Sequence, residues 1–380
     1  MQSLSTVFMK KKNTSSIKKS NKFIMVHPDF NDILITPAVV STIRSRSEIK
    51  AYQMSIGETP WLPLFVSPMD TVIGLDNWQL YLNNKMPICF PRDIRPDSFN
   101  EDDKGLLSAY SDVIFFSYSL EEASQMCEWL NNNKDKDLEF NILIDIANGH
   151  MAHMVDVVER LRERTKVKIM VGNIANPQTY KVLSEAGADF IRVGIGFGGG
   201  CLTAMNTGVG YSMAQLVKEC ADLKDQMESM GDRTAKIVAD GGFREYSDII
   251  KALALGSDYV MLGSILNKCL ESSGDTYWKG IKVSSNIANF LWKRKFKLEK
   301  KFRGMSTKEV QKKWGKSKLT TSEGVVRMRT VKYTLDGWTE NFVDYLKSSM
   351  SYTNSRTLKD FIGKVKWTVI SQNSFNRFNK

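Results

Sequence analysis

The amino-acid sequence predicts a closed barrel of eight parallel strands with helices between them, a TIM-type (β/α)8 fold. Three features predict it: eight short apolar runs follow one another, amphipathic helical segments separate most of them, and several runs end in glycine or polar residues. Continuous apolar runs are typical of strands buried on both faces. Strands that alternate with helices indicate a parallel sheet. Eight repeats in about 200 residues favour a closed barrel, although one miscounted strand would favour an open doubly wound sheet.

The predicted strands lie within the runs at 63–68 (PLFVSP), 86–90 (MPICF), 112–119 (DVIFFSYS), 141–147 (NILIDIA), 168–174 (KIMVGNI), 190–196 (FIRVGIG), 236–242 (KIVADGG) and 259–264 (YVMLGS). Helical patterns between them include LEEASQMCEWLNNN, HMVDVVERLRER and EYSDIIKALALG. The carboxyl ends of barrel strands meet at one face, where ligand sites are built. The glycines after the last two runs therefore predict phosphate binding through backbone N–H groups.

The remaining segments flank or interrupt this barrel. We expect a flexible basic tail at 1–22, a barrel domain at 23–365 and a C-terminal tail at 366–380. Residues 265–325 lack barrel periodicity and predict a long flap after the eighth strand. Helical patterns near 338–350 and 357–364 follow it. The tail KKKNTSSIKKSNK has no apolar region behind it and does not resemble a secretory signal.

Composition and charge narrow the function classes. Of the 380 residues, 42% are hydrophobic, but no apolar run reaches the ~18 residues of a membrane helix, so we expect no membrane partner. The net charge of +11 is concentrated in the N-terminal tail and in WKRKFKLEKKFRG. Neither segment forms a recognised nucleic-acid motif, which disfavours nucleic acid. Anionic small substrates fit the charge equally well.

Cysteine usage indicates a reducing compartment, and we expect a cytoplasmic protein. The five cysteines are odd in number and widely spaced, without a CxxC or Cys/His cluster, so neither zinc nor a disulfide framework is indicated. Cys201 differs because it follows Gly198, Gly199 and Gly200, which leave the sulfur accessible and offer N–H groups to an anion. We therefore predict a nucleophile at Cys201. The others are predicted to be core residues: Cys89, Cys127, Cys220 and Cys269.

The chain resembles the IMP dehydrogenase/GMP reductase family over residues 28 to 365, and it is most similar to the reductase branch. FNDILITPAVVSTIRSRSEI resembles the family's DVLIRP…STLKSRSEV segment, and GIGFGGGCLT resembles its catalytic loop, usually GIGPGSxCTT. SPMDTV, VADGG, VMLGS and GMST follow the family's motifs in order. LIDIANGH, TGVGY and TTSEG are reductase-like. The chain also lacks the regulatory insert and the flap Arg-Tyr pair of the dehydrogenases.

The resemblance implies NADPH-dependent reductive deamination of GMP to IMP. Cys201 would attack C2 of guanine, ammonia would leave, and NADPH would reduce C2. Soft thiolate suits a nucleophile that must also depart, the amine needs a proton donor, and the protein must orient the nicotinamide near C2. Family members are usually homotetramers, and the resemblance implies that backbone carbonyls of the catalytic loop bind a K+ ion.

Motif matches assign residues to these roles. The implied catalytic residues are Cys201, Thr203, Glu323, Asp145 and Arg92. The implied substrate-binding residues are Asn173, Asp240, Gly241, Gly242, Gly263, Ser264, Gly304, Met305, Ser306, Ser322 and Gly324. The implied cofactor-binding residues are Ser45, Arg46, Asp145, Ile146 and Ala147, the first two reaching an adjacent subunit. The implied cation loop comprises Gly196, Gly198 and Cys201. Asp240 suits ribose because a carboxylate can accept two hydroxyl hydrogen bonds, and Arg46 suits an NADPH phosphate.

Several positions depart from the reductase pattern. Arg92 replaces a lysine that lies in a His-Lys-His context, and arginine cannot hand over a proton, although it could still orient a carboxylate. The other departures are Phe197 for proline, Gly200 for an apolar residue, Leu202 for threonine, Thr320 for arginine, and the dehydrogenase-like Arg303. Three alternatives stay open: an IMP dehydrogenase, a catalytically impaired purine-nucleotide binder, and a basic flap that contacts nucleic acid.

Overall fold

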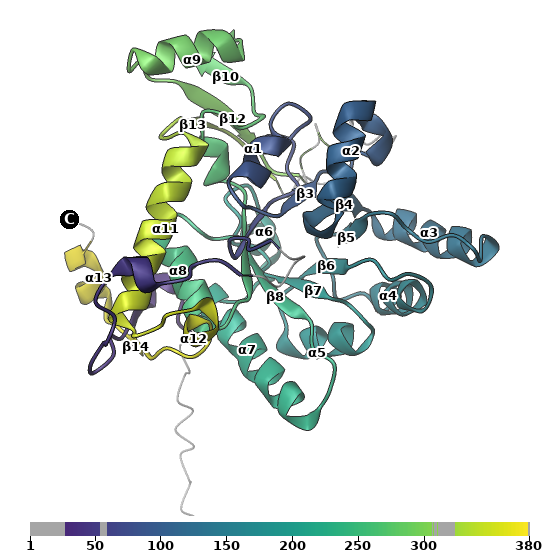
Figure 1. The fold of residues 1–380 in the computed structure, drawn as a ribbon, viewed down its shortest axis with the longest axis horizontal. Coiled ribbons are helices and arrows are strands. Elements are labelled where there is room, and N and C mark those ends of the chain that lie inside the picture. The colour runs from purple at the N-terminus through teal and green to yellow at the C-terminus, as the bar shows by residue number, and fades with distance from the viewer. Residues whose placement is uncertain (1–26, 54–58, 306, 308–309, 311–323, 379–380) are drawn as a thin grey trace, which may run out of the picture.

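A closed barrel of eight parallel strands forms the centre of the computed structural model, which describes residues 27–53, 59–305, 307, 310 and 324–378 (Figure 1). The strand order follows the chain, and the last strand pairs with the first. Each of the eight apolar runs contains one strand, so the predicted fold class is confirmed. The barrel strands are β2 (Leu64–Val66), β3 (Ile88–Phe90), β4 (Ile114–Tyr118), β5 (Asn141–Asp145), β6 (Ile169–Ile174), β7 (Phe190–Val193), β8 (Lys236–Asp240) and β9 (Tyr259–Leu262).

Aromatic side chains fill the inside of the barrel. The Phe65 ring on β2 lies 5.6 Å from that of Phe115, 5.7 Å from that of Phe190 and 5.1 Å from that of Tyr259, measured between centroids. These four residues come from four different strands, and all are almost fully buried. Edge-to-face and tilted aromatic contacts of this kind bury large apolar areas in the barrel interior.

Helices surround the strands, as Figure 1 shows. Their starts follow local sequence signals: Ser119 and Glu122, for example, form a reciprocal capping box at the start of α3. Among the described residues, every helix is too short or too polar to cross a lipid bilayer. The helices of the barrel region are α1 (Trp78–Asn83), α2 (Glu101–Ala109), α3 (Leu120–Asn132), α4 (Ala152–Arg164), α5 (Pro177–Glu185), α6 (Thr203–Thr207), α7 (Met213–Met230) and α8 (Tyr246–Leu255), with 3-10 turns η1 (Phe30–Asp32), η2 (Arg46–Glu48), η3 (Pro96–Ser98), η4 (Ser111–Val113) and η5 (Leu266–Lys268).

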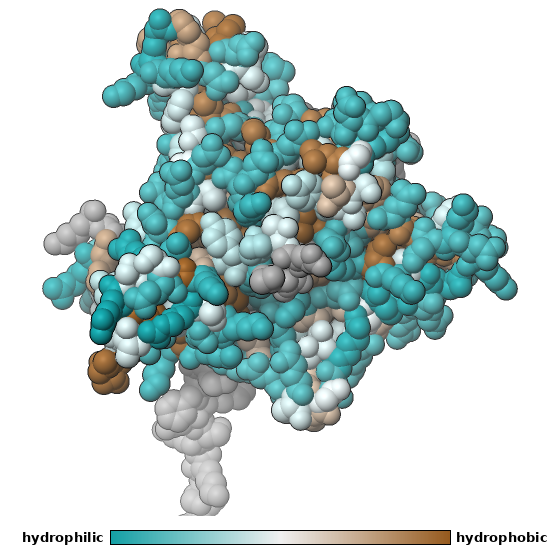
Figure 2. All heavy atoms as spheres, in the orientation of Figure 1, coloured by the Kyte–Doolittle hydropathy of each residue, from teal (hydrophilic) through white to brown (hydrophobic). Residues whose placement is uncertain are grey.

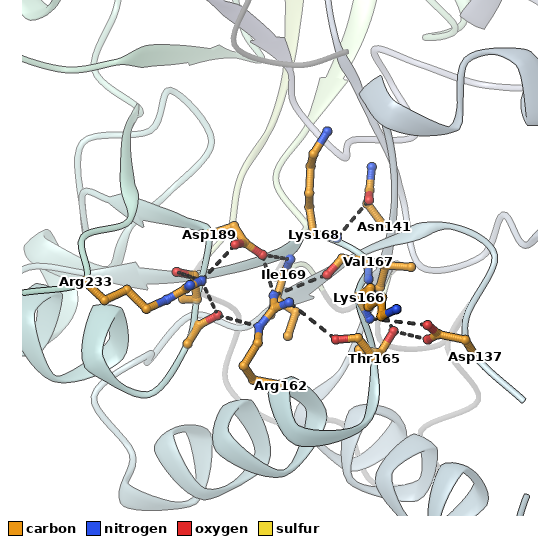
Figure 3. A network of polar contacts seen from close by, with 12 residues as sticks. Asp137, Asn141, Arg162, Thr165, Lys166, Val167, Lys168, Ile169, Asp189 and Arg233 are labelled. Atoms are coloured by element: carbon orange, nitrogen blue, oxygen red, sulfur yellow. Dashed lines mark hydrogen bonds and ion pairs between the residues drawn. The ribbon is translucent and has the colours of Figure 1, made fainter. Parts of the chain in front are cut away.

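A polar network ties together the amino ends of β5, β6 and β7 (Figure 3). The Asp189 carboxylate accepts hydrogen bonds from Arg233 at 2.9 Å, from the backbone N–H of Ile169 at 2.8 Å and from Arg162. Asn141 accepts from the backbone N–H of Lys168 at 2.9 Å. These contacts lie at the end of the barrel opposite the ligand face, where polar residues serve stability.

The segment after β9 forms a folded lobe, which we define as residues 276–303 and 326–330. Its four strands pair antiparallel in the order β11-β10-β12-β13, and the lobe projects beyond the barrel (Figure 1). A separate small core supports it, including Leu291, Leu298 and Val331. Figure 2 shows apolar residues on the surface of the lobe, and its exposed apolar residues include Ile281 and Phe290. Its elements are β10 (Thr276–Trp278), β11 (Ile281–Val283), α9 (Ser285–Lys293), β12 (Glu299–Arg303) and β13 (Val326–Thr330).

The C-terminal part packs back onto the barrel region. The predicted helical patterns correspond to α11 (Leu335–Tyr352) and α12 (Leu358–Phe361). Part of the segment expected as a tail at 366–380 has regular structure: β14 (Trp367–Val369) pairs antiparallel with β1 (Ile33–Ile35), and α13 (Gln372–Phe378) follows. Strand pairing between the two ends of the chain is a non-local contact that local periodicity does not reveal.

Candidate active site

A cavity of about 530 Å³ opens at the carboxyl ends of the barrel strands. This volume is in the range of pockets that enclose a small organic ligand. Most of the predicted site residues line it: Arg92, Asp145, Ile146, Ala147, Asn173, Gly196, Gly198, Cys201, Thr203, Asp240, Gly241, Gly242, Gly263, Ser264, Gly304 and Met305. Residues from the ends of β3, β5, β6, β7, β8 and β9 thus meet in one place.

Cys201 lines this cavity and is half-buried, whereas the four other cysteines are buried, as predicted. Its Sγ donates to Oγ1 of Thr203 at 3.2 Å. Thr203 is the first residue of α6, and the backbone N–H of Cys201 donates to the carbonyl oxygen of Gly198 at 2.8 Å. The loop therefore turns so that a thiol and a hydroxyl face the same cavity.

Backbone contacts join the catalytic loop to the end of the flap. The N–H of Val325 donates to Gly200 O at 3.1 Å, and the N–H of Gly304 donates to Val325 O at 3.0 Å. Cys201 and Gly324 form an isolated antiparallel bridge. A Cβ atom at Gly304 would lie 2.3 Å from Gly200 O, and one at Gly200 would lie 2.9 Å from the Gly304 Cα. Glycine at position 200, where the family usually has an apolar residue, is therefore required by this close approach.

A buried ion-pair network also lines the cavity. Arg192 on β7 donates to Asp145 Oδ1 at 2.6 Å through Nη1, and to Asp240 Oδ2 at 2.7 Å through Nη2 and 3.2 Å through Nε. Asn173 Nδ2 donates to the same Asp240 oxygen at 2.8 Å. Within the described part of the chain, the recorded contacts of Asp240 all fall on Oδ2. Its carboxylate is thus oriented by one oxygen, which leaves Oδ1 for a ligand.

Charge pairing outweighs burial in this network. Arg192 is 5% exposed, and burial alone would lower its pKa, but the carboxylates of Asp240 and Asp145 raise the pKa above its ordinary value. Cys89 lies near the network, and burial raises the pKa of its thiol far above the usual range. Arg192 is therefore a fixed positive charge, and Cys89 is an unreactive thiol.

The sequence-based site did not include Arg192. A signal was present, because an arginine inside the apolar run FIRVG needs a buried counter-ion when the strand is covered on both faces. The site also omitted other cavity residues: Ser67, Pro68, Met69, Gly194, Ile195, Gly199, Gly200, Phe243, Met261, Leu262, Ile265 and Phe302. The first three belong to the SPMDTV motif at the end of β2.

Arg92 contacts Asp145 in two ways. Its Nη2 donates to the Asp145 backbone carbonyl, and its Nε lies 3.9 Å from Asp145 Oδ2. Asp145 therefore lies between two guanidinium groups, those of Arg92 and Arg192. This arrangement is compatible with the expectation that arginine at position 92 orients a carboxylate.

Other predicted residues lie elsewhere. Ser45 and Arg46 are exposed at η2 and do not line the cavity of their own chain. Gly324 is adjacent to Cys201 through the backbone bridge rather than in the cavity lining. Ser306, Ser322 and Glu323 fall outside the described residues, as does Thr320. In the predicted cation loop, the Gly198 carbonyl accepts the Cys201 N–H, and the described residues contain no cluster of His, Cys, Asp or Glu that could hold a metal ion.

Known proteins with similar sequences share nearly the full length of this chain. A GMP reductase of Shewanella pealeana is 26% identical over 361 residues, which cover 92% of this chain and 97% of that protein. A GMP reductase of Caenorhabditis elegans is 27% identical over 356 residues, covering 90% and 92%. GMP reductase 2 of Mus musculus is 28% identical over 358 residues, covering 90% and 94%.

These relatives match nearly the whole chain, so the similarity extends from the N-terminal segment through the barrel to the C-terminal helices. The family model described as the IMP dehydrogenase / GMP reductase domain matches residues 132–378, which include the catalytic loop and most of the cavity wall. The chain therefore belongs to the IMP dehydrogenase/GMP reductase family of NAD(P)-dependent purine-nucleotide oxidoreductases.

Proposed function

We propose that this protein is a GMP reductase that converts GMP and NADPH into IMP, ammonia and NADP+. The observation that carries the proposal is the half-buried Cys201, whose thiol lines the cavity beside the Thr203 hydroxyl. The relatives named GMP reductase support the choice of reaction within the family.

The proposed substrate position follows from the chemistry of the walls. The ribose hydroxyls would donate to Asp240, which Arg192 and Asn173 hold through one oxygen. The phosphate would meet the backbone N–H groups near Gly242, Gly263 and Ser264, all at the cavity. With both ends so bound, the purine C2 would lie towards Cys201, with Gly304 and Met305 lining the same cavity.

The nicotinamide of the cofactor would lie near the end of β5. Asp145, Ile146 and Ala147 line the cavity there, and they offer a carboxylate, backbone polar groups and apolar side chains. NADPH, when bound, would supply the hydride that C2 accepts. The chain's own part is to orient the ring and to limit water, through the ion pairs that fix Asp145.

The proposed reaction has two steps, and atoms and electrons balance in each. First, Sγ of Cys201 bonds to C2, the bond from C2 to the exocyclic nitrogen breaks, and ammonia leaves after it gains a proton. Second, C2 accepts a hydride, the Sγ–C2 bond breaks, and IMP leaves with the thiolate restored. Thr203 and Glu323 would handle the departing ammonia, and Arg92 would hold Asp145 rather than donate a proton.

The proposal extends to the assembly and the cation. A homotetramer would let the exposed Ser45 and Arg46 reach the cofactor of a neighbouring subunit. A K+ ion would be held by carbonyl groups of Gly196, Gly198 and Cys201. We also propose a cytoplasmic location.

Purified protein mixed with GMP and NADPH tests the proposal. We expect oxidation of NADPH with one ammonia released per IMP formed. Cys201→Ala should lower this rate by roughly 10⁴-fold or more while GMP still binds, because the covalent step is lost. Cys220→Ala, which removes a buried thiol of α7, is the matched control and should keep the rate.

Three outcomes separate the alternatives. NAD+ reduction with IMP, forming XMP, would replace the proposal with a dehydrogenase. Tight GMP binding without turnover and without a Cys201–purine adduct in mass spectrometry would indicate a nucleotide binder. Comparable rates for Cys201→Ala and wild type would exclude the covalent route.

A further inference from the structure

Arg329 lies beside the proposed phosphate site, although the family motifs do not include it. It is on β13, directly opposite Lys300 of β12. Its guanidinium carbon lies 4.5 Å from the ring centroid of Phe302, a buried residue that lines the cavity. Stacking on an aromatic face fixes the plane of a guanidinium and leaves its edge for hydrogen bonding.

The contacts of Arg329 use little of its hydrogen-bonding capacity. Within the described part of the chain, its buried Nε has no hydrogen-bond partner. Its Nη2 donates to Gly199 O at 3.4 Å, the long limit for such a bond. A guanidinium carries five N–H donors, and burying them without partners is costly. The Arg329 side chain therefore has N–H donors that could bind an acceptor group of a ligand.

The surrounding charges are mainly positive. Burial and then the neighbouring Arg327 lower the pKa of Arg329. Burial also lowers the pKa of Lys268, and Lys332 and Arg329 add to this effect, opposed by Glu245. The backbone N–H of Lys332 donates to Lys268 O at 3.0 Å, so these residues are close in space. A dianion bound among these cations would relieve their repulsion.

Gly199 provides the space that Arg329 fills. A Cβ atom at Gly199 would lie 2.9 Å from Arg329 Nη2 and 3.3 Å from the side chain of Ser264. The related loop motif GIGPGSxCTT has serine at this position, whereas this chain has glycine. The glycine and the arginine are thus a spatial pair, located where Ser264 and the catalytic loop meet.

We propose that Arg329, which lies in the space left by Gly199, binds the phosphate monoester of the purine mononucleotide next to Ser264. The inference rests on the proposed function for the position of the nucleotide, and it adds a ligand from the lobe to a site otherwise built from barrel loops. A guanidinium binds phosphate by two N–H groups at once, which gives selectivity for a nucleotide over a nucleoside.

Calorimetric titration of the full chain with GMP, guanosine and NADPH tests this proposal. Arg329→Gln should weaken GMP binding about 10- to 100-fold and leave guanosine affinity unchanged, since one charge-assisted contact to phosphate is lost. Arg329→Lys should retain part of the affinity because it keeps the charge. Arg327→Gln is the matched control: it removes an equal charge from the same strand and should change GMP affinity less than about threefold.

Three results would overturn the proposal: unchanged GMP affinity in Arg329→Gln, an equal loss for guanosine, or a loss for NADPH alone, which would assign Arg329 to a cofactor phosphate. Each is measured without turnover. Failure of the proposed reaction would instead appear as wild-type protein that binds GMP but does not oxidise NADPH.

A double-mutant cycle provides a second measurement. Gly199→Ser alone should weaken GMP binding, because its Cβ would contact Arg329 Nη2. In the Gly199→Ser background, Arg329→Ala should cost at least threefold less affinity than it does in wild type. Additive losses would overturn the pairing of these two residues.

Discussion

Arg192 and Lys300 are both buried cations, at 5% and 3% exposure. Arg192 lines the cavity, whereas Lys300 belongs to the lobe, which contributes Phe302 to the same cavity. Arg192 belongs to the barrel wall and donates to two carboxylates, those of Asp145 and Asp240. Lys300 belongs to β12 of the lobe, and its Nζ donates to two neutral carbonyl oxygens, those of Ser272 and Gly274. The partners of the two cations therefore differ in charge rather than in number.

The pKa values move in opposite directions for this reason. Carboxylate partners raise the pKa of Arg192 in spite of burial. Burial lowers the pKa of Lys300 to about 8, and acidic groups such as Asp76 oppose this shift without direct contact. A buried cation thus keeps its charge securely only when a counter-ion touches it. The barrel wall has a permanent charge pattern, whereas the base of the lobe can lose its charge at moderately alkaline pH.

The largest expected effect comes from removing the cation of the barrel wall. Arg192→Met would leave Asp145 and Asp240 buried without their shared partner, so we expect a loss of roughly 3–5 kcal/mol in the free energy of unfolding. Urea titration measures this change. Arg160→Met is the control, because its exposed pair with Asp156 at 3.4 Å should contribute less than about 1 kcal/mol. Similar losses in both variants would contradict the assigned importance of the network.

A smaller effect is expected at the junction between the two walls. Gly304→Ala would bring a Cβ atom to 2.3 Å from Gly200 O and would push the lobe away from the catalytic loop. We expect a cost of about 1–3 kcal/mol in unfolding free energy and a fall in turnover of roughly 10²-fold, because the thiol is displaced. Steady-state kinetics with GMP and NADPH measures the second change.

Gly105→Ala is the control for this experiment. Gly105 lies within α2, where an added Cβ would meet nothing within 4 Å. Alanine there should stabilise the helix by about 0.5–1 kcal/mol and leave turnover unchanged. Normal turnover in Gly304→Ala would show that the catalytic loop tolerates movement of the lobe.

The difference between local and non-local contacts explains which features could be predicted from the sequence. All eight barrel strands could be predicted because each is a continuous apolar run, and Cys201 could be located because it follows a run of glycines. The ion pairs of Arg192 could not be derived in detail, since they depend on the order β5-β6-β7-β8 in the barrel, which brings the ends of β5, β7 and β8 to one place. A charged residue in an apolar run predicts a counter-ion but does not identify it.

The lobe was predicted only as a flap. Its strands β10 and β11 have three residues each, too few for a clear alternation. The turn between them, Lys279-Gly280, has positive φ at both residues, 49° and 81°, as in a tight hairpin. The sequence YWKGIK therefore contained a hairpin signal. Because charged residues surround it, the pairing of the two strands was not predicted.

The last expected effect concerns the cation of the lobe and appears only with pH. Because the pKa of Lys300 is about 8 in the folded chain against an ordinary 10.5, protonation opposes folding, and this cost disappears as pH rises through that window. The unfolding free energy of wild type should therefore gain on that of Lys300→Met by up to about 1.4 kcal/mol per pH unit above pH ~8, and the difference should be flat below pH ~7. Urea titrations at pH 6 to 10 measure this difference. Lys282→Met, a variant of an exposed lysine of the lobe whose pKa is raised by Asp275, should show no such gain. A difference for Lys300→Met that stays constant across the range would mean that the ammonium keeps its proton as firmly as Arg192 does, and the contrast between the two walls would then lie in geometry alone.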